Sequence, residues 1–136
     1  MGEINDAKML KVVLLLFAVV TLVYGIGYLV VPGVLVSISG GGPVNLGWIR
    51  WSGGTLIALA FGAMMVFRHP SRQRIFVTTI SWAALLIGLA LLYSWLTGES
   101  STSATWFIAL PTVVSLGLAF LLRWSGQKAK EVLKAE

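Results

Sequence analysis

The stretch VVLLLFAVVTLVYGIGYLVV, residues 12–31, follows Lys11 and contains no charged side chain. A helix of this length spans about 30 Å, the thickness of the hydrocarbon core of a bilayer. Three further apolar stretches of similar length follow, at about residues 48–67, 75–97 and 105–123. None of them alternates apolar and polar residues as a barrel strand does. The sequence therefore predicts an all-α integral membrane protein in which four transmembrane helices form an antiparallel bundle.

The composition excludes an ordinary water-soluble domain. The 136 residues are 57% hydrophobic and 11% charged, with a formal net charge of +5, whereas soluble domains carry roughly 25% charged residues. So few charges cannot cover a water-facing surface or keep a chain disordered. Cysteine is absent, which excludes disulfides and thiolate chemistry. We expect a single membrane domain over residues 1–136.

The basic residues predict the orientation of this domain. Nine of the ten fall in three regions: the N-terminus, an inner basic loop at 68–74, and the end of the fourth span together with the tail at 125–136. They are Lys8, Lys11, Arg68, Arg72, Arg74, Arg123, Lys128, Lys130 and Lys134. Only Arg50, just after an outer loop at 32–47, lies on the other side. The positive-inside rule then places both termini in the cytoplasm, with the protein in the inner or plasma membrane. The same basic residues are expected to attract anionic lipids at the cytoplasmic face.

Small residues spaced four apart predict where the helices pack, because helices in lipid associate by close approach. Gly54, Ala58 and Gly62 form such a row in the second span, and Ala84 and Gly88 form one in the third. We interpret these rows as contacts within the bundle. The alternative use of the same rows is contact with a second copy of the chain, in a homo-oligomer, or with another membrane protein, and that alternative stays open.

Pro111 interrupts the fourth span. Proline removes one backbone hydrogen bond from a helix and bends it, and transmembrane helices tolerate this where neighbouring groups satisfy the freed carbonyl. We expect a structural kink. A hinge, or a residue lining a small cavity, is the alternative role.

One group of residues points to a binding site. Arg50 is the sole basic residue on the outer side, and aromatic residues are predicted at similar depth: Trp48, Trp51, Tyr28, Trp95 and Trp106. An arginine among aromatic rings is able to hold an anionic lipid headgroup or a quinone-like ring. The alternative is an arginine that extends to the headgroups within an aromatic belt.

The residue inventory offers no catalytic group within a span. All acids lie in termini or a loop, at Glu3, Asp6, Glu99, Glu131 and Glu136, and the single histidine, His69, lies in the inner loop. Proton relays need an ionisable group inside the membrane, and metal or haem sites need clustered ligands. We therefore predict a protein that is not an enzyme, with no metal, no cofactor and no nucleic-acid partner.

The segments 28–32 (YLVVP), Arg50 with Gly53 and Gly54, and 68–74 resemble small bacterial four-span membrane proteins grouped as domains of unknown function. A more distant similarity, in size and span number, is to DoxX-like membrane subunits, which implies a quinone-linked accessory role. The residues themselves predict two functions, the first from the rows of small residues and the second from the group around Arg50. The first is a structural or accessory membrane protein that packs with a partner or with itself. The second is a binder or carrier of an amphipathic small molecule or lipid through the pocket around Arg50.

Overall fold

The computed structural model describes residues 2–99 and 104–134, and every regular element in that part of the chain is a helix. In chain order the helices are α1 (Gly2–Val30), α2 (Pro32–Ser39), α3 (Leu46–Arg68), α4 (Arg74–Leu96), α5 (Trp106–Lys128) and α6 (Lys130–Lys134). Four of them are long and apolar enough to cross a membrane: α1, α3, α4 and α5. This confirms the prediction of an all-helical protein with four candidate spans and indicates a multi-pass membrane protein.

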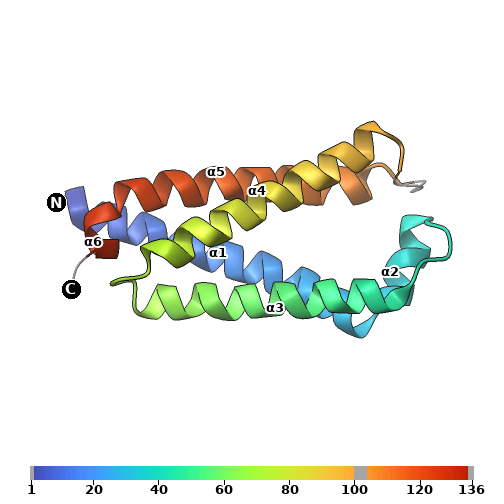
Figure 1. Ribbon diagram of the computed structural model, residues 1–136, viewed down its shortest axis with the longest axis horizontal. Coiled ribbons are helices and arrows are strands. Elements are labelled where there is room, and N and C mark those ends of the chain that lie inside the picture. Colours follow the sequence, from blue (N-terminus) through green and yellow to red (C-terminus); the bar gives the residue numbers. More distant parts are fainter. Residues whose placement is uncertain (1, 100–103, 135–136) are drawn as a thin grey trace.

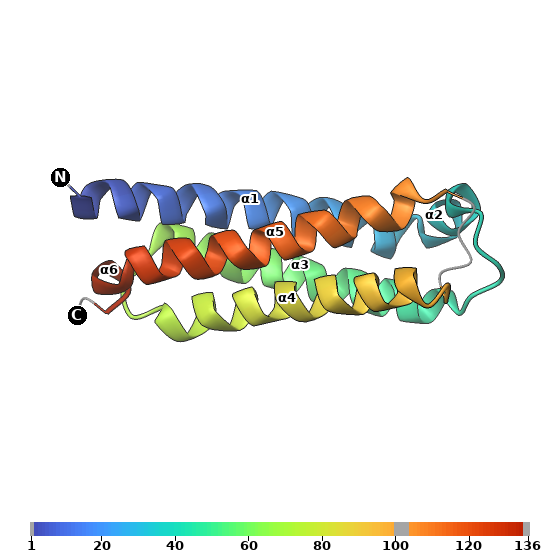
Figure 2. The same ribbon diagram turned by 90° about the horizontal axis from the view of Figure 1, so that it is seen from above.

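The four long helices lie along the long axis of the molecule, and both termini lie at the same end (Figure 1). We call this the termini end and the opposite one the α2 end. The view from above shows the same arrangement (Figure 2). The main contacts join α1 to α3 and α4 to α5, and α1 also packs on α5. By contrast, α3 and α4 contact each other little: a short turn at 69–73 joins them at the termini end, and they separate towards the α2 end (Figure 1).

The hydrophobic core lies nearer the termini end. Its buried members come from 10–18 of α1, 63–66 of α3, 77–84 of α4 and 118–122 of α5, with Leu133 of α6. The buried apolar cluster therefore lies where α3 and α4 are close, at the termini end of the bundle.

The segment predicted as an outer loop at 32–47 contains a helix. α1 ends at Val30, and Pro32 is the first residue of α2. Proline suits this position because a first helical residue needs no N–H partner and its φ is already helical. Gly40 ends α2 in the left-handed conformation, with a φ of 70°, which glycine adopts without strain. The apolar residues of this segment thus form a short helix at the α2 end.

The predicted tail at 125–136 is also corrected. α5 continues to Lys128 and α6 follows from Lys130 to Lys134, while 135–136 lie outside the described residues. Ala129 and Leu133 are each only 1% exposed and belong to the core. The tail folds back because these two apolar side chains gain from burial against the termini end of the bundle.

The packing row predicted in the second span does not lie at the contact between α3 and α1. Gly54 and Ala58 are exposed, and a Cβ on Gly54 would meet nothing within 4 Å. The close approach runs through Gly53, where a Cβ would lie 2.7 Å from the carbonyl oxygen of Gly25. Gly62 is half-buried and makes a different contact, with the ring of Phe76 on α4.

The row predicted in the third span does lie at a helix contact. Ala84 and Gly88 are buried, and a Cβ on Gly88 would lie 2.6 Å from a methyl group of Leu116. α4 and α5 therefore pack closely at this point, and the missing side chain of Gly88 makes room for Leu116.

Candidate functional site

A cavity of about 330 Å³ lies between the four long helices, on the α2 side of the core. We call it the interhelical cleft. Its lining consists almost entirely of aromatic and aliphatic side chains with a few hydroxyl groups: Phe17, Val20, Thr21, Tyr24, Tyr28, Trp51, Ser52, Thr55, Leu56, Leu59, Ala84, Ile87, Leu91, Pro111, Val114, Ser115 and Leu118. This volume is at the lower end of the range for small-molecule sites.

One face of α1 supplies the aromatic wall of the cleft. Phe17, Thr21, Tyr24 and Tyr28 follow at spacings of four, three and four residues, which places them on one side of a helix. The rings of Tyr24 and Tyr28 meet edge to face, with centroids 5.9 Å apart. The hydroxyl of Thr21 donates to the carbonyl of Phe17 at 2.8 Å. This spacing was available in the sequence, but only Tyr28 of the four was predicted as a site residue.

α3, which packs beside α1, supplies an adjoining wall. The hydroxyl of Ser52 donates to the carbonyl of Trp48 at 2.9 Å, and that of Thr55 donates to the carbonyl of Trp51 at 3.1 Å. These bonds use the hydroxyl hydrogens, so each oxygen keeps lone pairs to accept a hydrogen bond. The ring of Trp51 is 67% exposed and meets that of Trp48 edge to face at 5.9 Å. The hydroxyl groups of Ser52 and Thr55 are therefore placed to accept a hydrogen bond from a ligand.

Pro111 lies inside α5 and lines the cleft. Because proline has no N–H, the carbonyl of Phe107 lacks its usual donor at position 111. The neighbouring carbonyl, that of Ile108, accepts a hydrogen bond from the hydroxyl of Thr112 at 2.7 Å. The predicted alternative role of Pro111, as a residue of a cavity wall, agrees with this position.

A second hollow of about 300 Å³ adjoins the cleft at the α2 end. Four residues line both, namely Tyr28, Ser52, Leu91 and Pro111. Side chains of α2 also line it: Leu35, Val36 and Ser39. Thus α2 borders this continuation of the cleft.

The cleft contains part of the predicted aromatic group. Tyr28 and Trp51 line it, and Trp48 contacts Trp51. Arg50 is exposed and lines neither the cleft nor the hollow beside it, because one residue along a helix turns a side chain by about 100° from that of Trp51. Two further predicted residues also lie outside both cavities: Trp95 near the end of α4, and Trp106 at the start of α5.

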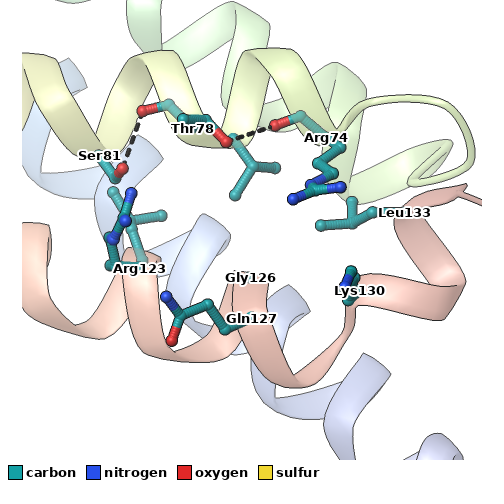
Figure 3. A pocket seen from close by; sticks show the side chains of 10 residues that line it. Arg74, Thr78, Ser81, Arg123, Gly126, Gln127, Lys130 and Leu133 are labelled. Carbon is teal, nitrogen blue, oxygen red and sulfur yellow. Dashed lines mark hydrogen bonds between the residues drawn. The ribbon is translucent and has the colours of Figure 1, made fainter.

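A third cavity, of about 440 Å³, lies at the termini end between α4, α5 and α6. We call it the basic pocket, and its residues are Arg74, Val77, Thr78, Ser81, Leu122, Arg123, Gly126, Gln127, Lys130 and Leu133. Figure 3 shows Arg74, Arg123 and Lys130 around it, with Arg123 extending towards Ser81. From the sequence these three cations are explained by orientation and by general attraction to anionic lipids. The pocket is not evident there, because its residues come from three segments of the chain.

Neither the cleft nor the basic pocket is lined by a His, Cys, Asp or Glu residue. Over residues 2–99 and 104–134, these residue types do not gather in groups of three that could hold a metal ion. The polar chemistry of the two cavities is therefore hydrogen bonding and, in the basic pocket, positive charge. Comparisons with protein-family models, curated proteins and solved structures found no match to this chain, so the resemblance to four-span bacterial proteins and DoxX-like subunits stays a prediction.

Proposed function

We propose that this chain is an antiparallel four-helix transmembrane bundle of the inner or plasma membrane, with both termini in the cytoplasm. Two observations support this topology. The long helices lie along one axis with both termini at one end, and nine of the ten basic residues belong to segments at that end. The positive-inside rule assigns such an end to the cytoplasm, where its charges attract anionic lipids.

Single cysteines test the topology, because the chain has no cysteine of its own. We expect Val44→Cys, in the connection between α2 and α3, to react with an impermeant maleimide in intact cells. Ser71→Cys, between α3 and α4, should react only after the membrane is permeabilised. Each variant is the control for the other, and labelling of Ser71→Cys alone in intact cells would contradict the proposed orientation.

For the function, we propose that the protein binds an amphipathic molecule with a neutral polar group in the interhelical cleft, without catalysing a reaction on it. The observation that carries this proposal is the cleft itself, an apolar cavity with hydroxyl groups between two helix pairs. Residues of both α3 and α4 line the cleft, and these two helices contact each other little, which favours the passage of a molecule from the lipid phase between them.

The lining chemistry defines the class of ligand. None of the charged residues that the structure describes lines the cleft, and an ion in an apolar site without a partner is costly. This modifies the prediction of an anionic headgroup held by Arg50. Lone pairs on Thr21, Ser52 and Thr55 fit a hydroxyl or amide donor, while the aromatic wall fits a ring or a hydrocarbon chain. A lipid alcohol or a reduced, quinol-like ring has these features.

A matched pair of substitutions on α5 tests the proposal. Ser115→Phe places a ring in the cleft, whereas Gly117→Phe places the same ring on an exposed position with nothing within 4 Å of its Cβ. We expect Ser115→Phe to weaken binding of cis-parinaryl alcohol, a fluorescent lipid alcohol, about tenfold, since overfilling a site costs about 1–3 kcal/mol. Gly117→Phe should bind it like the wild type. Equal binding by both variants would rule the cleft out as the site.

The predicted structural or accessory role is a second candidate function, because Gly54 and Ala58 lie exposed on α3 instead of inside the bundle. Rows of small residues let a second helix approach closely. Native mass spectrometry of the protein in mild detergent separates the two roles. A retained small molecule, lost in Ser115→Phe, supports the binder, whereas a second polypeptide supports the accessory role.

A further inference from the structure

The basic pocket carries unbalanced positive charge. Arg74, Arg123 and Lys130 line it from three different helices. Asp6, Glu99 and Glu131 are the acids whose side chains the structure describes, and none of them lines the pocket. Like charges around one cavity repel each other, so a bound anion lowers the energy of the arrangement.

The donors around the pocket fit a phosphate group. Guanidinium groups bind phosphate oxygens through paired N–H donors, and lysine adds a point charge. The amide of Gln127 is a further donor in the lining. The hydroxyls of Thr78 and Ser81 donate instead within α4, to the carbonyls of Arg74 and Thr78 at 2.9 and 2.8 Å. The charged donors are therefore the main ligands, and Figure 3 shows them on opposite sides of the cavity.

The floor of the pocket indicates a ligand that also has an apolar part. Val77, Leu122 and Leu133 are buried residues that line it. Next to it, the guanidinium of Arg123 lies 5.9 Å from the ring centroid of Trp82, which is 51% exposed. Trp82 lies on α4, one of the four candidate spans. An exposed aromatic ring on a span is a surface for acyl chains, so the pocket joins a phosphate-binding group to a lipid-facing surface.

We propose that the basic pocket binds the phosphate group of an anionic phospholipid, with Arg74, Arg123 and Lys130 as its cationic ligands. This proposal rests on the proposed topology only where it places the lipid in the cytoplasmic leaflet. The interhelical cleft is a separate site with an uncharged ligand. The proposal for the basic pocket and the proposal for the cleft are therefore tested independently, and one is able to be wrong without the other.

The test compares two triple variants with the same change in charge. The pocket variant is Arg74→Gln, Arg123→Gln and Lys130→Gln. The control variant is Arg68→Gln, Arg72→Gln and Lys134→Gln, which removes two arginines and one lysine of the same end that do not line the pocket. Native mass spectrometry in a non-ionic detergent measures retention of added phosphatidylglycerol, and phosphatidylcholine serves as the zwitterionic reference.

We expect the pocket variant to lose phosphatidylglycerol affinity about tenfold or more, because each charge-assisted hydrogen bond contributes strongly. Lys130→Gln alone should weaken binding about fivefold, on the scale of one basic group near an anionic lipid. This single variant changes an exposed side chain at the start of α6, so the test does not depend on whether the triple variant folds. The control variant should lose clearly less affinity than the pocket variant, because its three side chains attract an anionic lipid only from outside the pocket.

Two competing results have clear meanings. Equal loss in the pocket and control variants, or equal retention of phosphatidylglycerol and phosphatidylcholine by the wild type, would overturn the proposal. Inorganic phosphate is added as a competitor to identify the source of the group. If phosphate does not displace the lipid, the result supports a lipid site. If phosphate displaces the lipid at millimolar concentration, the result supports the three cations as ligands of a phosphate group but overturns the lipid as the natural source of that group.

Discussion

Gly53→Ala is expected to destabilise the folded protein by about 3 kcal/mol or more, while Gly54→Ala leaves it unchanged or stabilises it by up to about 1 kcal/mol. The two positions are neighbours on α3 and the added group is one methyl. At Gly53 the new Cβ would lie 2.7 Å from the carbonyl oxygen of Gly25 and 2.7 Å from the backbone nitrogen of Leu29. These are backbone atoms and are unable to turn aside, so α1 and α3 have to separate.

The cost is large because α1 and α3 form one of the two main helix contacts of the molecule. In lipid, apolar side chains gain nothing by leaving one hydrocarbon phase for another, and helix association depends on close contact. At Gly54 the new methyl group meets nothing within 4 Å, and alanine is the better helix former.

Unfolding in mixed lipid and SDS micelles, followed by circular dichroism, measures both variants. Gly54→Ala is the matched control, since it makes the same chemical change one residue away. A loss of stability in Gly54→Ala with none in Gly53→Ala would mean that the row predicted from the sequence, through Gly54 and Ala58, is the true contact within the chain.

The sequence was sufficient to predict the spans but not the rotation of the helices about their axes. Hydropathy identifies segments that prefer lipid to water, and the four candidate spans follow from that property. Rotation is different, because a side chain facing lipid and one facing a neighbouring helix are both apolar. In a soluble helix a polar face would distinguish Gly53 from Gly54. Here spacing favours Gly54, which is followed four residues later by Ala58, whereas the packing against Gly25 selects Gly53.

The candidate sites were predictable to the extent that their residues share one segment. Tyr28, Trp51 and Pro111 were selected from the sequence and line the cleft, but the rest of the aromatic wall depends on which face of α1 turns inward. Arg50 was selected for its charge and depth, yet it is exposed and lies outside the cleft. The basic pocket joins Arg74 to Arg123, 49 residues apart in sequence, and a single sequence does not bring such positions together.

The segment before the C-terminus was predicted as a cytoplasmic tail but packs on the bundle through Leu133. The stability of Leu133→Ala measures how much this packing contributes. A residue in a free tail contributes nothing to stability. Leu133 is instead 1% exposed and lies in the same buried cluster as Leu10 and Leu122. Truncating such a leucine costs about 2–5 kcal/mol. We therefore expect the free energy of unfolding to fall by about that amount, measured as for Gly53→Ala.

Glu131→Ala is the control for Leu133→Ala, because Glu131 is exposed on the same short helix, and we expect it to have little effect on stability. The two substitutions also separate a structural from a binding role for α6. Leu133 forms part of the floor of the basic pocket, so Leu133→Ala should lower phosphatidylglycerol retention together with stability, whereas Lys130→Gln should lower retention alone. If Leu133→Ala unfolds like the wild type, α6 does not pack on the bundle, and the basic pocket loses one of its three walls.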